Sequence, residues 1–364
     1  MKQIEILVIG GGPAGLCAAA AAAELGAHVL VLERDSKPGG QLVKQTHKFF
    51  GSKKQYAGDR GIHIGDFLLE QVTNHPLTEV WTDTTALGIY EDGVVTVEKD
   101  NQHLKIKPEK IIVATGASEK ALMFPNNDLP GIYGAGAVQT LMNVAGIVPG
   151  QRVLMVGAGN IGLIVSYQLL QAGVEVAAII EGAPTIGGYL VHASKVRRAG
   201  VPIMTSYTVK EAYGKDTLEG AVVCKLDDKW QPIPGTEQDI KADVMCLAVG
   251  LSPLTELCWQ SGCEMKYIAE LSGHVPVRSE YLETTRPGLY VAGDVSGVEE
   301  ASAAMVEGRL AGVSAALSLG FGKDKGCQMQ LDAMEELKEL RSGPAGEKTM
   351  KGLVKLTGKE GAVC

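Results

Sequence analysis

The sequence predicts an α/β protein of two domains, each with a central parallel sheet and a small antiparallel layer. Two observations support this fold class. One pattern occurs twice: a strand of Val, Ile and Leu, a Gly-x-Gly-x-x-Gly turn, a helix, a second strand and a closing acid. After each copy, short alternating β segments lead to a further apolar strand that ends in a glycine turn. Strands that alternate with helices favour a parallel sheet covered on both faces.

The two copies begin as ILVIGGGPAGL and VLMVGAGNIGL. Each is Rossmann-like, because an apolar strand precedes the glycines, a helix follows them, and an acid lies roughly 20 residues further on. The glycines and acids are Gly10, Gly12, Gly15 and Glu33 in the first copy and Gly157, Gly159, Gly162 and Glu181 in the second.

Each glycine has a separate role in such a unit. The first permits a tight turn, the second lets a pyrophosphate approach the backbone, and the third lets the helix lie close to the strand. The helix N-terminus faces the phosphates, and the acid accepts from a ribose 2′-hydroxyl. Glu181 favours NAD over NADP because it would repel a 2′-phosphate, although Arg197 and Arg198 follow on a predicted helix. Two such units imply two nucleotide cofactors and suggest that electrons pass between them.

Composition limits the class of protein. The chain has 364 residues and a formal net charge of −8 at pH 7. The length suggests two domains, and the negative charge argues against nucleic-acid binding, which needs a basic surface. No apolar run is long enough to span a bilayer, and the N-terminus enters a core strand without a cleavable signal. Seven scattered cysteines are typical of a reduced, cytoplasmic protein.

The expected domain boundaries follow changes in composition. Residues 1–118 form the first part of one domain, residues 119–252 form the second domain, and residues 253–322 return to the first. A crossing rich in Pro and Gly, FPNNDLPGIYGAG, connects the two domains. Residues 323–364 form a charged C-terminal helical tail, which is either a solvated arm, the interpretation we favour, or a docking surface.

Four short motifs carry a family resemblance. GGGPAG, the GGQ of Gly39 to Gln41, the ATG of Ala114 to Gly116 and the AGD of Ala292 to Asp294 resemble FAD-domain signatures. They are typical of the two-dinucleotide-binding-domain FAD/NAD(P) oxidoreductase superfamily, in a thioredoxin-reductase-like domain order. The crossing LPGIYGAGAVQTL, followed by PGQRVLMVGAG, is similar to the FAD/NAD-type alpha subunits of amine-oxidising complexes. These include sarcosine oxidase, dye-linked proline dehydrogenase and hydrogen cyanide synthase.

The resemblance implies FAD in the first copy, with an NAD-binding domain inserted, and NAD(H), or else ATP or ADP, in the second. Asp294 would accept from the ribityl chain, and a helix cap or turn residue is the alternative interpretation. Backbone N–H groups of Ala301 and Ser302 would donate to the flavin C2 carbonyl. The expected FAD contacts are Gly10, Gly12, Pro13, Ala14, Gly15, Glu33, Arg34, Gly40, Gln41, Thr46, Thr84, Ala114, Thr115, Gly116, Gly293, Asp294, Ala301 and Ser302. The expected NAD contacts are Gly157, Gly159, Asn160, Ile161, Gly162, Glu181 and Gly250.

Candidate catalytic side chains are few, because the flavin itself would do the chemistry. His47 and Lys48 lie in QTHKFF, next to the segment expected beside the flavin, where a cation could tune the ring or bind an acidic partner. An ordinary surface loop is the alternative, and it applies equally to Gln41 and Thr46. No His, Cys or Asp cluster has the spacing of a metal site.

The cysteines depart from the family pattern. Thioredoxin reductases carry Cys-x-x-Cys where this chain has Gly136 to Gln139, and glutathione-reductase relatives carry a pair where it has Gly40 to Phe50. Neither stretch contains cysteine. After Asp294 only Cys327 and Cys364 follow, too few for an iron–sulfur cluster held by one chain. The two cysteines of CWQSGC, at positions 258 and 263, are predicted to be buried thiols rather than a redox disulfide.

These observations leave three functions open. The leading one is a FAD-dependent oxidoreductase that passes electrons between NAD(H) and a partner protein, as a subunit of an amine- or imino-acid dehydrogenase complex of sarcosine or proline type. The partner would be a second flavoprotein subunit or an iron–sulfur carrier, and the protein an oligomer. The second is an electron-relay or structural subunit with FAD in site one and ATP or ADP in site two. The third is a free-standing NADH-dependent reductase.

Overall fold

The computed structural model describes residues 1–49, 51–344 and 346–358. They form two compact units. The first unit contains residues 1–118 together with the residues from 251 onward, and the second unit contains residues 119–250. The chain passes between the units through two short strands that pair with each other, β7 (Ala117–Glu119) and β16 (Leu251–Pro253).

A seven-stranded sheet forms the centre of the first unit, in the order β3-β2-β1-β6-β5-β4, with β19 also paired to β6. The strands are β1 (Lys2–Ile9), β2 (Val29–Leu32), β3 (Thr78–Trp81), β4 (Thr84–Ile89), β5 (Val95–Lys99), β6 (Gln102–Val113) and β19 (Leu289–Val291). β4, β5 and β6 pair antiparallel, and the other pairings are parallel. Ile9 lies opposite both Leu32 and Val113, so three parallel strands end together where the first glycine turn begins.

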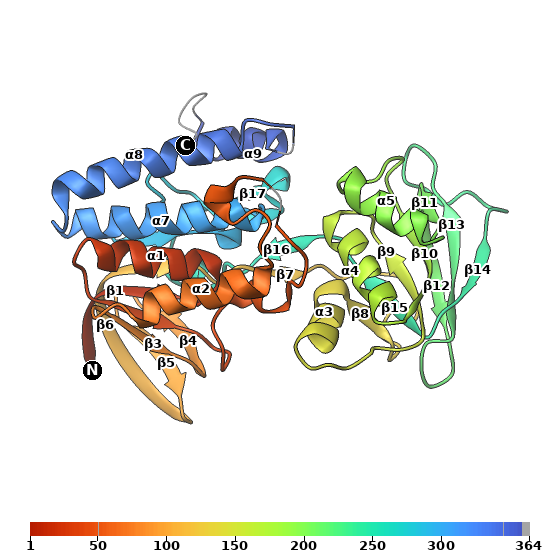
Figure 1. Cartoon of the computed structure of the whole chain (residues 1–364), viewed down its shortest axis with the longest axis horizontal. Helices are drawn as coiled ribbons and strands as arrows, with labels where there is room; N and C mark the ends of the chain where they lie inside the picture. The colour runs from red at the N-terminus through yellow and green to blue at the C-terminus, as the bar shows by residue number, and fades with distance from the viewer. Residues whose placement is uncertain (50, 345, 359–364) are drawn as a thin grey trace. The chain divides into compact units, whose positions relative to one another are not determined.

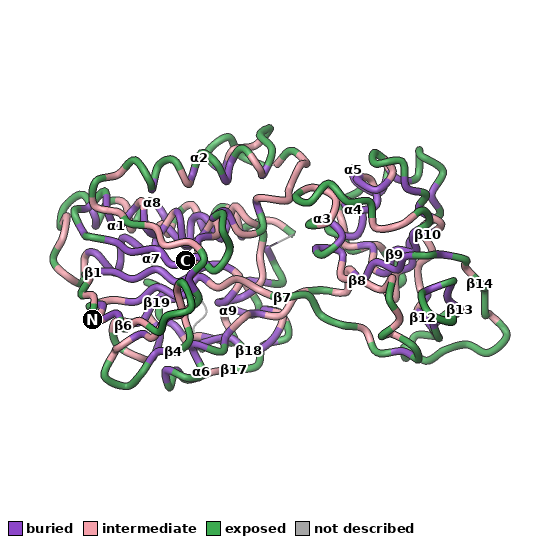
Figure 2. Tube along the Cα trace, turned by 90° about the horizontal axis from the view of Figure 1, so that it is seen from below, coloured by how far each residue is buried: buried purple, intermediate pink, exposed green. Residues whose placement is uncertain are grey.

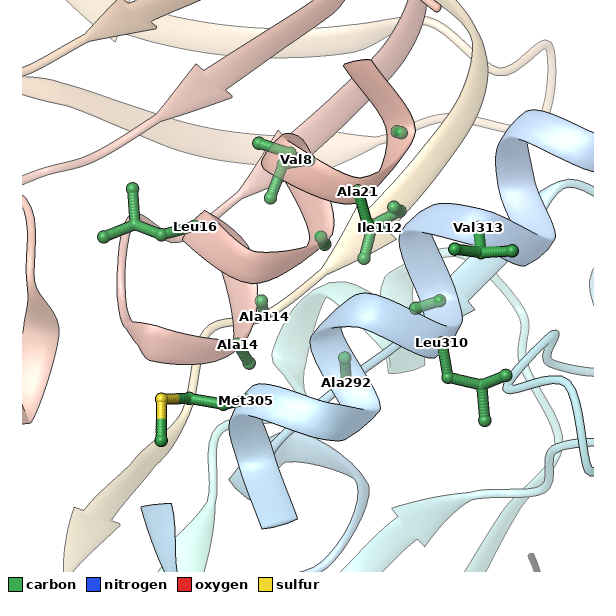
Figure 3. Close-up of a cluster of buried hydrophobic side chains, with 14 of the residues drawn as sticks. Val8, Ala14, Leu16, Ala21, Ile112, Ala114, Ala292, Met305, Leu310 and Val313 are labelled. Atoms are coloured by element: carbon green, nitrogen blue, oxygen red, sulfur yellow. The ribbon is translucent and has the colours of Figure 1, made fainter. Parts of the chain in front are cut away.

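Helices α1 (Pro13–Glu24) and α7 (Ala301–Ser318) pack against each other beside this sheet (Figure 3). A Cβ atom on Gly308 would lie 2.0 Å from the Ala14 carbonyl oxygen, and one on Gly312 would lie 2.1 Å from that of Ala18. The two glycines therefore let the backbones of the helices touch. Figure 2 shows that most of α7 and the second half of β1 are buried. This unit also contains α2 (Gly61–Thr73), α6 (Glu256–Gln260), and the 3-10 segments η1 (Gly40–Lys44), η2 (Lys53–Gln55), η3 (Ala269–Leu271) and η4 (Asp294–Ser296).

The C-terminal segment belongs to the first unit, and the favoured interpretation of it as a solvated arm is wrong. Helix α8 (Lys323–Leu340) lies along α7 (Figure 1) and buries Ala333 and Leu337 in the α1–α7 core. Helix α9 (Glu347–Thr357) buries Leu353 and Leu356 against η3 and the hairpin of β17 (Met265–Ile268) and β18 (Gly273–Pro276). Most charged residues of the C-terminal segment lie on the outer faces of these helices, so a charged composition concealed an apolar inner face.

The second unit repeats the plan. Its five-stranded sheet is parallel throughout, in the order β11-β10-β9-β15-β8, and a three-stranded sheet in the order β12-β13-β14 forms the antiparallel layer. The strands are β8 (Ile132–Gly134), β9 (Arg152–Val156), β10 (Glu175–Glu181), β11 (Ile203–Thr205), β12 (Tyr207–Tyr213), β13 (Gly220–Lys225), β14 (Gln238–Lys241) and β15 (Val244–Leu247), and the helices are α3 (Ala135–Asn143), α4 (Asn160–Gln171) and α5 (Leu190–Arg198).

The expected fold class, two Rossmann-like units with small antiparallel layers, is confirmed. Which nucleotide each unit holds stays a prediction. Among the described helices, none combines the length and apolar character needed to cross a membrane.

Candidate nucleotide-binding sites

The first glycine turn crosses the carboxyl ends of three strands. Gly10 has φ +110°, and a Cβ there would lie 2.3 Å from the carbonyl oxygen of Ala114 at the end of β6. A Cβ on Gly15 would lie 1.8 Å from the Gly10 carbonyl oxygen. Only glycine therefore lets the chain turn here and lets α1 begin close to β1.

The second turn has the same geometry. Gly157 has φ +108°, and a Cβ there would lie 2.3 Å from the carbonyl oxygen of Ala248, just after β15. A Cβ on Gly162 would lie 2.0 Å from the Gly157 carbonyl oxygen. Ala248 corresponds to Ala114, so both the glycine turn and the strand end beneath it are repeated.

The closing acids are held alike in the two units. The Glu33 carboxylate accepts from the backbone N–H groups of Gly11 and Asp35, both at 2.9 Å. The Glu181 carboxylate accepts from those of Ala158 at 2.7 Å and Ala183 at 3.0 Å. Since a carboxylate offers about four lone-pair sites, each acid is fixed against its glycine turn and can still accept from a ribose hydroxyl.

The starts of α1 and α4 fit a phosphate. Their N-cap residues are Gly12 and Gly159, and within the described part of the chain no side chain caps either helix and no acid lies in either first turn. A Cβ on Gly12 would be 3.8 Å from its nearest described neighbour, the Cα of Gly40, and one on Gly159 would have no described atom within 4 Å. A helix start that no described side chain caps, with room in front of its N-cap glycine, is what a pyrophosphate needs.

A pair of glycines after each acid closes over the turn. Gly39 donates to the Gly11 carbonyl at 2.7 Å, and a Cβ on Gly40 would lie 2.9 Å from the Gly12 Cα. In the second unit Gly188 donates to the Ala158 carbonyl at 3.0 Å, and a Cβ on it would lie 2.8 Å from the carbonyl carbon of Gly159. Gly40 is among the expected FAD contacts. The corresponding glycines of the second unit, Gly187 and Gly188, are not among the expected NAD contacts, although the motif IGGYL parallels PGGQL.

The loop of residues 293–300 joins β19 to α7. Gly293 has φ +76°, and a Cβ on it would lie 2.9 Å from the Ala14 side chain, so the loop meets the start of α1. The Asp294 carboxylate accepts from the Glu299 N–H at 3.3 Å. Burial raises the pKa of Asp294 to about 7, with the nearby Glu307 acting in the same direction and the Glu299 N–H opposing it. Asp294 thus stabilises the turn of its own loop, as the alternative interpretation expects. It also lies beside the first glycine turn.

A buried ionic cluster that the sequence did not predict lies beneath this loop. It consists of Arg278, Glu299, Glu307 and Arg341. Although burial would raise the pKa of the Glu307 carboxyl, the two arginines hold it below its usual value, so Glu307 stays ionised. No local sequence motif predicts such a cluster, since its members are dispersed between residues 278 and 341.

Other predicted FAD contacts lie around the first turn. The buried Thr84 donates its backbone N–H to the Glu33 carbonyl at 2.9 Å, and Thr115 donates its hydroxyl to the Leu254 carbonyl at 2.7 Å. Gly116 has φ +76° with open space before it. Arg34 is exposed and forms a loose ion pair with Asp35, at 3.9 Å. Pro13 is the first residue of α1, and Ala301 and Ser302 begin α7, which has no described side-chain cap.

The remaining candidates lie on loops and helix ends. Gln41 is exposed at the start of η1, and the segment of Thr46 to Lys48 is tied to the start of α2 at Arg60. In the second unit the Asn160 side chain accepts from the Tyr189 N–H at 2.8 Å, Ile161 is exposed, and Gly250 has φ +114°. Phe50 and Cys364 lie outside the described residues.

Where thioredoxin reductases carry their cysteine pair, this chain has a helix start bound by a carboxylate. Gly136 and Ala137 lie in the first turn of α3, and their backbone N–H groups donate to the Glu119 carboxylate at 2.7 and 3.3 Å. Cys258 and Cys263 are buried free thiols, as expected, and burial raises the pKa of Cys258. Cys17 of α1 is partly buried and packs against the core, and burial raises its pKa to about 12. The described residues contain no group of side chains able to hold a metal ion.

Comparison with known proteins decides the family. Residues 4–308 match the family model described as pyridine nucleotide-disulphide oxidoreductase. The chain belongs to this family. It is therefore an oxidoreductase of a flavoprotein type whose members bind FAD and typically NAD(P).

Curated relatives extend the likeness. An opine oxidase subunit of Agrobacterium tumefaciens (strain Ach5) is 30% identical over 332 residues, which cover 86% of this chain and 66% of the relative. The hydrogen cyanide synthase subunit HcnB of Pseudomonas protegens is 26% identical (87% of this chain, 71% of the relative). The alpha subunit of sarcosine oxidase from Corynebacterium sp. (strain P-1) is 28% identical (87% and 33%). The chain thus spans just under two thirds of the opine oxidase relative and one third of the sarcosine oxidase relative.

Solved structures show the same fold. Thioredoxin reductase from T. acidophilum superposes with a TM-score of 0.72 at 21% identity, covering 88% of this chain and 99% of that one. L-Proline dehydrogenase from P. horikoshii superposes with a TM-score of 0.69 at 22% identity, covering 93% and 59%.

Proposed function

We propose that the chain is a FAD-dependent oxidoreductase that passes electrons between NAD(H) and a partner protein, as a subunit of an amine- or imino-acid-oxidising complex. The repeated phosphate turn is the observation that carries this proposal. Two turns of the same geometry, each with a fixed acid and a helix start that no described side chain caps, suit two adenine dinucleotides.

FAD in the first unit would supply a centre that accepts and releases a hydride. The protein's part is binding and orientation. The N–H groups at the start of α1 would hold the pyrophosphate, Glu33 would accept from the adenosine ribose, and Asp294 would accept from the ribityl chain. The start of α7, with Ala301 and Ser302, would direct positive backbone charge toward the ring and favour its reduced form.

NAD(H) in the second unit would use α4 and Glu181 in the same way. Glu181 favours the dinucleotide without a 2′-phosphate, because a phosphate would meet a carboxylate already held in place by Ala158 and Ala183. Arg197 and Arg198, which left NADP open, lie exposed in the last turn of α5.

A partner protein as the other redox agent is supported by two observations. Glu119 binds the α3 N-terminus where thioredoxin reductases carry their cysteine pair, so the chain has no disulfide of its own there. The relatives in opine oxidase, hydrogen cyanide synthase and sarcosine oxidase are each named as subunits. The partner would be a second flavoprotein subunit or an iron–sulfur carrier.

Anaerobic titration with NADH tests the proposal. The purified chain should be yellow, and NADH should bleach the visible flavin band with a stoichiometry of one NADH per FAD. Release of the nucleotides by heat, followed by chromatography, should recover FAD and NAD. Recovery of FAD with ATP or ADP and no bleaching would contradict hydride transfer in favour of a relay subunit.

A further inference from the structure

The buried ionic cluster consists of two carboxylates and two guanidinium groups. Arg341 Nη2 lies 2.7 Å from Glu307 Oε1 and 2.6 Å from Glu299 Oε1, and its Nε donates to Glu299 Oε2 at 3.1 Å. Arg278 Nη2 donates to Glu307 Oε1 at 2.9 Å. The Arg341 and Glu307 side chains are 1% and 3% exposed, so their charges are compensated by each other rather than by water.

The cluster is hydrogen-bonded to the loop of residues 293–300, to which Glu299 itself belongs. Glu307 Oε2 accepts from the Gly293 N–H and from the Ser296 hydroxyl, both at 2.9 Å. Glu299 donates its backbone N–H to the Asp294 carboxylate. A continuous set of hydrogen bonds therefore runs from Arg341 through Glu307 and Glu299 to both sides of Asp294.

Arg341 comes from outside the part of the chain that the family model matches, which ends at residue 308. It follows the last residue of α8, and α8 lies along α7 (Figure 1). The C-terminal segment thus places one buried cation beneath this loop, although more than 40 residues separate Arg341 from Glu299 in the sequence.

We propose that Arg341 is a positioning residue for the flavin: it balances Glu299 and Glu307, and so fixes the loop carrying Asp294 and sets the charge near the bound ring. The inference rests on the proposed binding of FAD by the first unit. Without Arg341, Arg278 alone faces two buried carboxylates, and one negative charge is left uncompensated beside Asp294. This excess charge should loosen the loop and disfavour the anionic reduced flavin.

The test compares three variants of the full chain, each reconstituted with FAD. Arg341→Met removes the cation, Glu299→Gln removes one of its carboxylates, and Arg309→Met is the matched control. Arg309 of α7 also forms an ion pair with a residue of α8, Glu336, but it makes no described contact with the loop of residues 293–300. The readouts are the FAD dissociation constant and the flavin midpoint potential.

Arg341→Met should weaken FAD binding about tenfold or more, because the loosened loop would lose the proposed hydrogen bond between Asp294 and the ribityl chain, and a hydrogen bond to a charged group has about this value. Arg309→Met should stay near wild type. The midpoint potential should fall in Arg341→Met and rise in Glu299→Gln, because the two changes alter the buried charge in opposite directions. A purely structural loosening of the loop would move both potentials in the same direction.

The proposal is overturned if Arg341→Met matches Arg309→Met in FAD affinity and potential, or if the potentials of the two cluster variants shift together. If Arg341→Met does not fold, Arg341→Lys and Arg309→Lys replace the two arginine variants, and only the first should weaken FAD binding. A wild-type chain that binds no FAD would overturn both this inference and the proposed function, whereas normal wild-type binding with unaffected variants overturns the inference alone.

Discussion

Two glycines of the second turn have different roles, and alanine substitutions should separate them. Gly159 has φ −74° and ψ 179°, a backbone that alanine adopts, and a Cβ there meets open space. A Cβ on Gly162 would lie 2.0 Å from the Gly157 carbonyl oxygen. Gly159→Ala therefore places a methyl group in the space expected for the phosphates, whereas Gly162→Ala pushes α4 away from β9.

The two changes should differ in stability. Gly159→Ala should lower the free energy of unfolding by about 1 kcal/mol at most, because the backbone there already suits alanine and the cost is that of a poorer N-cap. Gly162→Ala should cost about 1–3 kcal/mol or more, since overpacking here forces the backbone to move. Both should weaken NADH binding. For Gly159→Ala the loss should be about tenfold or more, the value of one lost hydrogen bond to a charged group.

Urea unfolding of the nucleotide-free protein and calorimetric titration with NADH measure these effects. The expected pattern is near-normal stability with weak binding for Gly159→Ala, and loss of both for Gly162→Ala. Wild-type NADH affinity in Gly159→Ala would refute the assignment of this turn to phosphate, whatever its stability.

Three further changes test other parts of the structure. Because Asp294 has a pKa of about 7 in the folded protein and about 4 when unfolded, the folded state holds a proton that the unfolded chain releases. The nucleotide-free wild type should therefore lose stability from about pH 4 to 7 relative to Asp294→Asn, and parallel urea-unfolding profiles would exclude this. Gly308→Ala, which places a Cβ 2.0 Å from the α1 backbone, should lower the free energy of unfolding by about 1–3 kcal/mol; an unchanged urea midpoint would contradict the close helix contact. Cys258 and Cys263 should resist a thiol reagent until urea is added, and their double alanine variant should keep NADH-driven bleaching; loss of bleaching would indicate a redox role.

Sequence alone could predict the glycine turns, because their chemistry is local. A strand, three spaced glycines and an acid are contained in one short segment, and steric limits on the backbone allow few other conformations. The structure places Gly10, Gly15 and Glu33 around one turn, and Gly157, Gly162 and Glu181 around the other.

The C-terminal segment could not be predicted in this way. Its helices carry most of their charges on their outer faces, and the apolar residues of α9 pack against residues far away in the sequence, such as Leu271. Arg341 resembles an ordinary surface arginine until folding brings Glu299 and Glu307 around it. Similarly, no motif marks Glu119 as the acceptor at the start of α3. Such long-range polar contacts depend on tertiary packing rather than on local pattern.

Identification of the nucleotides bound per chain tests the central claim most directly. Protein reconstituted with FAD and NAD, freed of excess ligand and denatured, should release one FAD and one NAD for each polypeptide. Gly159→Ala should release FAD but little NAD. A colourless preparation that retains no flavin, or a wild-type chain that binds only one nucleotide in total, would contradict the account.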